Sequence, residues 1–268
     1  MLYNAKDGIL EFGGGSMEYI RFGKGEKHLV MLPGLGDSLR SIKGTALPVA
    51  LMYRMFAKDY TVWMFSRKQP LPEGCTTRDL ARDQAEAMEA LGIRRADVLG
   101  VSMGGMISQW LAIDYPEKVG KLVLAVTCPE PNAIMTESVE EWIALAKQGE
   151  HTAFMDSNLQ RIYSPEYCRK NKWMVPLLGK LTKPKSYDRF FIQAQACLTH
   201  NALENLHRIR AGTLVIGGEQ DLTLGGDASR QLASAIPGAR IYMYRQWGHG
   251  LYEEAKDFNG VVLDFLNE

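Results

Sequence analysis

Short apolar runs alternate along the first half of the chain with stretches whose apolar residues recur every three or four positions. The apolar runs predict buried strands at residues 28–32, 60–65, 96–99 and 122–126. The stretches between them predict helices, and the one over residues 76–91 opens with a capping-box pattern. This alternation is typical of an α/β protein with a parallel sheet and helices on both of its faces.

Two further elements belong to this half of the chain. Residues 9–12 and 17–22 predict a short antiparallel hairpin, closed by the three glycines at 13–15. Between the strands at 28–32 and 60–65, a helix is predicted. Its expected apolar stripe consists of Leu47, Leu51, Met55 and Phe56.

The alternation breaks between residues 129 and 210, where no strand is predicted. Helical spacing predicts four amphipathic helices there, over residues 137–147, 153–163, 165–178 and 187–207. Their large apolar side chains would form a small core against the sheet, and some would line a pocket: Trp142, Phe154, Met155, Leu159, Trp173, Met174, Leu177, Phe190 and Phe191. The basic residues between 169 and 189 predict a solvated face. Alternation then returns, with strands at 213–217 and 239–244 and helical segments within 222–236 and 261–266.

The strand at 96–99 leads into a motif that carries chemistry. Gly100-Val101-Ser102-Met103-Gly104 is a G-x-S-x-G pattern, and it stands between a predicted strand and a predicted helix, as a nucleophile elbow requires. The glycines leave room for a sharp turn whose serine adopts a strained backbone conformation. The turn also places the Ser102 hydroxyl at a helix N-terminus, where backbone amides stabilise negative charge.

A serine hydroxyl needs a base, and that base needs a carboxylate to orient it. His249 lies in a glycine-flanked loop after the last strand, and Asp221 follows the strand at 213–217. Loops after parallel strands share one edge of a sheet, so Ser102, Asp221 and His249 are predicted to meet there. Glu219 is the rival acid, two residues before Asp221.

The other four histidines are weaker candidates for the base. His28 precedes a strand and is expected at the opposite edge of the sheet. His151, His200 and His207 lie in the inserted region, where they could at most touch substrate.

An acyl-transfer reaction also needs two donors for the developing oxyanion. The backbone amide of Met103, directly after the serine, is one candidate. The second is expected from the glycine-bearing loop Pro33-Gly34-Leu35-Gly36, most reasonably the amide of Leu35.

Composition narrows the class of protein. The 268 residues carry 31 basic and 31 acidic side chains, so nothing indicates a nucleic-acid partner. We expect no signal peptide, no membrane span, and reduced thiols at Cys75, Cys128, Cys168 and Cys197, as in a cytoplasmic protein. The scattered cysteines and histidines predict no metal site.

Taken together, these motifs resemble the α/β-hydrolase-fold family with a helical cap, over nearly the whole chain. The resemblance rests on Pro33-Gly34-Leu35-Gly36, on Leu99 to Gly105 with Ser102, on Gly218-Glu219-Gln220-Asp221 and on Gly248-His249. It implies an eight-stranded, mostly parallel sheet built from residues 1–129 and 211–268, with residues 130–210 inserted as a cap after the sixth strand. It implies neither a metal nor an organic cofactor.

The resemblance has two departures. Pro33 stands where the family often has His, and Val101 stands where it often has His or Asn. Both departures change the floor of the substrate pocket. We expect Gly34, Val101 and Trp142 to contact the substrate in this pocket. A serine nucleophile in place of aspartate argues against the haloalkane dehalogenase and epoxide hydrolase branches.

The resemblance and the triad predict a hydrolase that cleaves a small, largely apolar carboxylic ester, thioester or lactone through an acyl-enzyme. A same-fold acyltransferase, carbon–carbon bond hydrolase or perhydrolase remains open, as does a non-enzymatic ligand receptor or scaffold. The sequence leaves the oligomeric state open.

Overall fold

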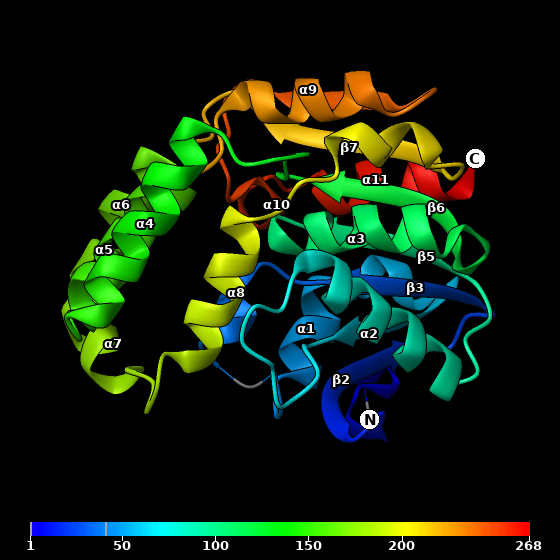
Figure 1. Ribbon diagram of the computed structural model, residues 1–268, viewed down its shortest axis with the longest axis horizontal. Coiled ribbons are helices and arrows are strands. Elements are labelled where there is room, and N and C mark those ends of the chain that lie inside the picture. Colours follow the sequence, from blue (N-terminus) through cyan, green and yellow to red (C-terminus); the bar gives the residue numbers. More distant parts are fainter. Residues whose placement is uncertain (1, 41) are drawn as a thin grey trace.

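One eight-stranded sheet organises the molecule, which a computed structural model describes over residues 2–40 and 42–268 (Figure 1). The strand order is β1-β2-β4-β3-β5-β6-β7-β8. The hairpin strands β1 and β2 are antiparallel, β2 pairs antiparallel with β4, and the remaining pairs are parallel. The strands are β1 Lys6–Phe12, β2 Gly15–Gly23, β3 Lys27–Leu32, β4 Tyr60–Phe65, β5 Ala96–Val101, β6 Val119–Ala125, β7 Gly212–Gly218 and β8 Arg240–Tyr244. The predicted mostly parallel sheet is confirmed.

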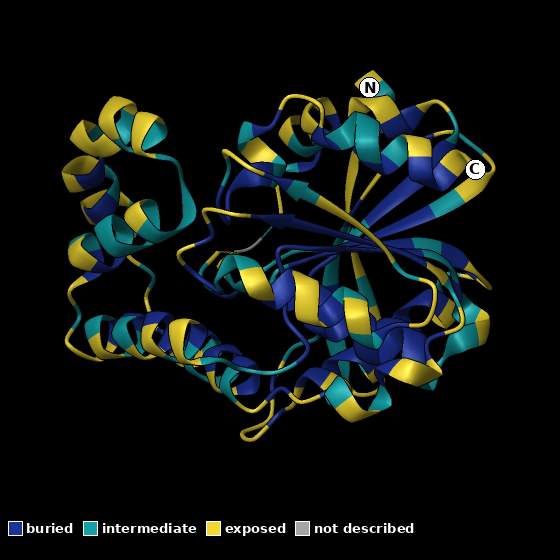
Figure 2. Ribbon diagram, turned by 90° about the horizontal axis from the view of Figure 1, so that it is seen from above, coloured by how far each residue is buried: buried dark blue, intermediate teal, exposed yellow. Residues whose placement is uncertain are grey.

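Helices cover both faces of this sheet because its central strands are apolar on both sides. Val98 of β5 packs in the cluster with α2 and α3, whereas the next residue, Leu99, packs in the cluster with α1 and α11. Figure 2 shows the buried strands between the two helical layers. The flanking helices are α1 Ala46–Met52, α2 Thr77–Ala90, α3 Met103–Asp114, α9 Gly226–Ala235, α10 Leu251–Glu254 and α11 Phe258–Asn267.

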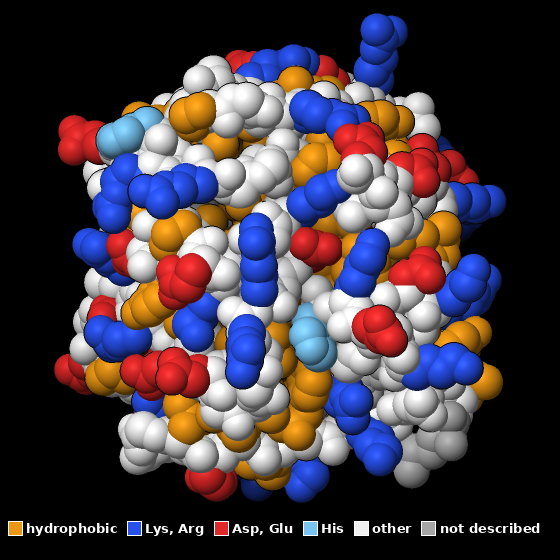
Figure 3. Space-filling view, turned by 90° about the vertical axis from the view of Figure 1, so that its right-hand side faces the viewer, with side chains coloured by type: hydrophobic (Ala, Val, Ile, Leu, Met, Phe, Trp, Pro, Cys, Tyr) orange, Lys and Arg blue, Asp and Glu red, His pale blue; other side chains and the backbone are white. Residues whose placement is uncertain are grey.

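Five helices follow β6 and precede β7, at one end of the sheet (Figure 1). They are α4 Ala133–Lys147, α5 His151–Ile162, α6 Pro165–Asn171, α7 Val175–Leu181 and α8 Asp188–Leu198. The opposite end of the molecule shows basic and acidic side chains intermingled over its surface (Figure 3). Within the described part of the chain, no helix has the length and apolar character needed to cross a membrane.

The predicted apolar stripe after β3 is confirmed only at Phe56, which is buried, and is wrong for its other three members. Leu47, Leu51 and Met55 are 47%, 41% and 46% exposed, and the small residues Ala46 and Ala50 are buried instead. The helix α1 ends at Met52 and a separate 3-10 helix follows, so the helical period does not continue across the whole stretch. Alanines on the buried side let the short helix approach the sheet closely.

Two of the longer predicted helices are interrupted. The segment 165–178 divides into α6 and α7, because Pro176 is tolerated in the first turn of a helix but not in its interior. Trp173 and Leu177 are exposed rather than part of a core. The segment 187–207 ends its α-helix at Leu198. There the backbone turns away, and the Ala202 amide donates to the Pro129 carbonyl at 2.9 Å.

Candidate active site

Ser102 occupies the sharp turn between β5 and α3. Its backbone has φ 54° and ψ −121°, a left-handed conformation that is rare for a residue with a side chain. The turn is held because the Ser102 amide donates to the Ala125 carbonyl of β6 at 2.9 Å. The hydroxyl therefore stands clear of the sheet at the start of α3.

The flanking glycines are required by close backbone contacts. A Cβ on Gly104 would lie 1.9 Å from the Leu32 carbonyl oxygen, and one on Gly100 would lie 2.6 Å from the Gly104 carbonyl oxygen. Neither backbone atom can yield, so any larger residue would force α3 away from the sheet. The spacing of the two glycines thus follows from the packing of this turn.

His249 and Asp221 lie beside Ser102, although both are distant from it in sequence. His249 Nε2 is 3.0 Å from Ser102 Oγ, and His249 Nδ1 is 2.8 Å from Asp221 Oδ2. Both of these side chains are buried and Ser102 is half-buried, so the three groups form a continuous polar chain that runs from the protein interior to the serine. The structure brings together the three residues predicted for a catalytic triad.

The second oxygen of Asp221 is fixed by its own loop. Asp221 Oδ1 accepts the backbone amides of Thr223 at 2.8 Å and Leu224 at 2.9 Å. Two amide donors orient the carboxylate while leaving its other oxygen for His249. Glu219, the rival acid, instead pairs with Arg230 on α9.

The loop after β3 approaches the serine closely. A Cβ on Gly34 would lie 3.2 Å from Ser102 Cβ, and Gly34, Leu35 and Met103 all line the cavity above the serine. Met103 is the first residue of α3, so its amide has no acceptor within the helix. Both backbone amides predicted for an oxyanion hole thus border the same space.

Charged side chains packed against the loop after β3 hold it in place. Arg67 Nη2 donates to the Pro33 carbonyl at 2.6 Å. The carboxylate of Asp37, fully covered by its surroundings, accepts Ser66 Oγ at 2.9 Å and pairs with Arg189 of α8 at 3.3 Å. Arg189 is therefore an exception to the predicted solvated face between 169 and 189. The ion pair between Asp37 and Arg189 links the loop after β3 to the helices inserted after β6.

A cavity of about 410 Å³ opens above Ser102. The residues predicted to contact substrate, Gly34, Val101 and Trp142, all line it. Most of its wall is apolar, with contributions from Met103, Met106, Met135, Val139, Phe154, Phe190 and Leu224. Some of the inserted aromatic residues thus line a pocket, while others, such as Phe191, pack against the core.

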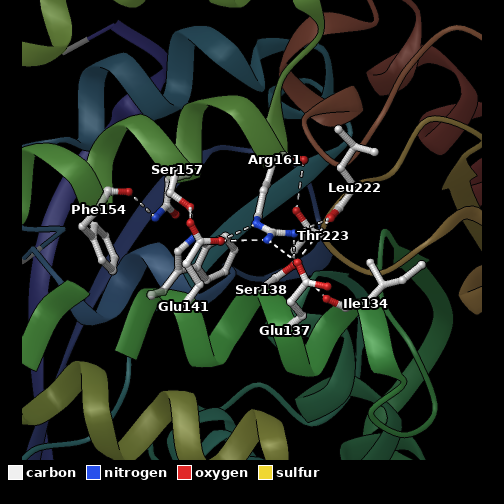
Figure 4. Close-up of polar contacts among 11 residues, drawn as sticks. Ile134, Glu137, Ser138, Glu141, Phe154, Ser157, Arg161, Leu222 and Thr223 are labelled. Carbon is white, nitrogen blue, oxygen red and sulfur yellow. Dashed lines mark hydrogen bonds and ion pairs between the residues drawn. The ribbon is translucent and has the colours of Figure 1, made fainter. Parts of the chain in front are cut away.

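The end of α5 ties the acid and base loops together. Arg161 reaches from α5 toward α4 and toward the loop after Asp221 (Figure 4). Its carbonyl accepts Thr223 Oγ1 at 3.2 Å, and its guanidinium pairs with Glu137 at 2.9 Å and Glu141 at 2.8 Å. The next carbonyl, that of Ile162, accepts the Gly250 amide beside His249 at 2.6 Å. The sequence alone does not indicate these contacts, because nothing local to Arg161 reveals its distant partners.

Replacing Arg161 with methionine is expected to destabilise the protein by about 2 kcal/mol, since it leaves two neighbouring carboxylates without their shared partner. Urea unfolding measures this free energy. Lys170→Met, which removes an exposed ion pair with Glu166, is the matched control and should cost less than about 0.5 kcal/mol. Adding Glu137→Gln to Arg161→Met should recover part of the loss. If Arg161→Met and Lys170→Met unfolded at the same urea concentration, the contacts of Arg161 would not stabilise the protein more than an exposed ion pair does.

The remaining histidines lie outside the cavity wall. His28 is the second residue of β3, at the sheet edge opposite Ser102, and its Nδ1 accepts a hydrogen bond from the Trp63 indole N–H at 3.2 Å. His151 contacts Tyr187, and His200 contacts Thr77. Burial lowers the pKa of His200 to about 3, so it is a neutral, structural side chain. Over the residues that the structure describes, no group of three or more His, Cys, Asp or Glu side chains is arranged to hold a metal.

The chain matches the model of the alpha/beta hydrolase fold family over residues 27–256, and it belongs to that family. It is 29% identical over 265 residues to the 2-hydroxy-6-oxo-6-phenylhexa-2,4-dienoate hydrolase of Comamonas testosteroni. The alignment covers 94% of this chain and 91% of that protein. The predicted fold and the coarser part of the predicted function, a hydrolase, are confirmed.

Two solved structures share the fold over almost the full length. MGS-M2, an alpha/beta hydrolase enzyme from a Medee basin deep-sea metagenome library, superposes with a TM-score of 0.87 at 22% identity, over 97% of this chain and 98% of that one. The enol-lactonase from Burkholderia xenovorans LB400 superposes with a TM-score of 0.81 at 21% identity, over 97% and 100%.

Proposed function

We propose that this protein is a serine hydrolase that cleaves a small, largely apolar carboxylic ester, thioester or lactone through an acyl-enzyme. The observation that carries the proposal is the hydrogen-bonded chain from Ser102 Oγ through the His249 ring to Asp221, at 3.0 and 2.8 Å. It lies at the floor of an apolar cavity whose volume suits a small organic ligand.

In the proposed reaction, Ser102 Oγ attacks the substrate carbonyl while His249 Nε2 takes its proton. Asp221 holds the imidazolium, and the amides of Leu35 and Met103 donate to the oxyanion. The tetrahedral intermediate collapses to an acyl-serine as His249 protonates the leaving group. A water molecule, deprotonated by His249, then releases the acid and restores Ser102. No metal or organic cofactor takes part.

Residues 130–210 act in this proposal as a cap over the site. Their helices supply Trp142, Phe154 and Phe190 to the cavity wall, and Arg189 links them to the loop after β3. The cap would therefore shape the apolar part of the substrate site.

The test is steady-state kinetics on a panel of short-chain p-nitrophenyl esters, thioesters and lactones. We expect continued turnover of at least one class, with a preference for short acyl chains because the cavity is small. An added alcohol should divert little product if water is the acceptor, whereas dominant transfer to the alcohol would identify an acyltransferase. Turnover of carbon–carbon substrates with no ester, thioester or lactone cleaved would contradict the proposal.

A further inference from the structure

The cavity draws its walls from the two apolar clusters on opposite faces of the sheet. One part, which we call the methionine lobe, belongs to the cluster with α2 and α3: Met103, Met106, Met135, Val139, Trp142, Phe154 and Phe190. The other part, the tyrosine lobe, consists of Tyr53, Tyr163, Tyr252 and Glu253, and it includes residues of the cluster with α1 and α11. A substrate held at Ser102 between the two clusters meets a different chemistry on each side.

Charge is distributed unevenly around this space. Among the described residues that line the cavity, none is lysine or arginine. Of its two acidic residues, Asp37 is covered and paired with Arg189. The other, Glu253, accepts the Tyr163 hydroxyl at 2.7 Å, which is a neutral donor. Burial raises the pKa of this carboxyl, so its negative charge is most complete at alkaline pH, where the assays below are run. Its neighbour in sequence, Glu254, is a second acid, bonded to the Ser164 hydroxyl and amide.

From this we propose that the site takes uncharged substrates and rejects those that carry a carboxylate, and that Glu253 is a residue that sets this selectivity. The inference rests on the proposed function. A substrate carboxylate in the methionine lobe would lose its hydration with no lysine or arginine side chain to compensate its charge. In the tyrosine lobe it would face Glu253, and like charges about 6 Å apart at a protein surface disfavour binding by about 100-fold.

The proposed preference for uncharged substrates differs from the substrate charge that the name of one relative indicates. The Comamonas testosteroni protein is named for a dienoate, which carries a carboxylate. Such a substrate calls for a cationic or hydrogen-bonding partner in its pocket. This cavity offers no lysine or arginine side chain among its described lining residues. The fold is thus shared, but the charge of the preferred substrate should differ.

Two matched ester pairs test the proposal. The first pair is 4-nitrophenyl glutarate, with a free carboxylate on the acyl half, and its methyl-capped counterpart. The second is 4-carboxyphenyl butyrate, with the carboxylate on the leaving group, and 4-(methoxycarbonyl)phenyl butyrate. The quantity compared is the ratio of kcat/KM for the capped and the free ester. For the wild-type enzyme we expect a ratio of about 100 in each pair, from the electrostatic penalty in one lobe and desolvation in the other.

The variant Glu253→Gln should bring the ratio from about 100 to near one for the pair whose carboxylate enters the tyrosine lobe, and leave the other pair unchanged. Glu166→Gln removes an exposed carboxylate that pairs with Lys170 and does not line the cavity, so it is the matched charge control and its ratios should stay near those of the wild type. Wild-type ratios near one, or ratios that Glu253→Gln does not alter, would overturn the inference. If neither capped ester is hydrolysed, the proposed function itself fails, which is a distinguishable result.

Discussion

Replacing Ser102 with alanine should lower kcat on the best ester substrate by about 10⁶. In the proposed mechanism the Ser102 hydroxyl forms the covalent bond to the acyl group, and no other hydroxyl takes its place at His249 Nε2. Alanine fits the same backbone space, and it removes only the Oγ atom that lies 3.0 Å from the histidine. Binding of substrate should therefore persist while the chemical step is lost.

Ser234→Ala is the control for this change, because Ser234 is an exposed serine on α9 whose hydroxyl donates only to the Gln231 carbonyl. Its kcat should match that of the wild type. Both variants should unfold at similar urea concentrations, which would show that the Ser102 variant is folded. A Ser102→Ala protein with more than about one-hundredth of the wild-type kcat would place the nucleophile elsewhere.

The change Asp221→Asn should lower kcat by about 10⁴, because the amide presents a donor to His249 Nδ1 and favours the wrong tautomer of the ring. The backbone amides of Thr223 and Leu224 would still bond the side-chain oxygen, so the geometry should persist. Glu219→Gln should change kcat less than threefold, in line with an exposed ion pair to Arg230 that lies away from the histidine.

The pair of acid variants is compared by steady-state kinetics on one ester at one pH, with circular dichroism to confirm folding. A large loss in Glu219→Gln and a small one in Asp221→Asn would exchange the roles of the two carboxylates. Equal losses would mean that the acid loop as a whole, rather than one side chain, supports the histidine.

The elements that follow local rules could be predicted from the sequence. The strand–turn–helix around Ser102 carries its own signature, since an apolar run, two glycines and a helical repeat must all coincide there. The capping box at Thr76 and Asp79 is present in the structure, with both reciprocal hydrogen bonds. Asp221 and His249 follow from topology, because parallel strands bring their carboxyl ends to one edge.

The features that depend on distant partners could not be predicted in this way. Arg161 looks like any basic residue on an amphipathic helix until α4 and the acid loop are placed beside it. The sequence predicts a solvated position for Arg189 because its partner Asp37 lies 152 positions away. Glu253 belongs to a four-residue helix after His249 that the pattern did not predict. Side-chain charge in the cavity is therefore a property of the assembled fold.

The most direct test of the central claim is intact-mass spectrometry after treatment with a small fluorophosphonate, which labels only an activated serine. We expect one adduct per chain, mapped to Ser102, and no adduct in the His249→Ala variant, whose serine has lost its base. A folded wild-type protein that gains no adduct, or gains it on another residue, would contradict the claim that Ser102, His249 and Asp221 form a working catalytic triad.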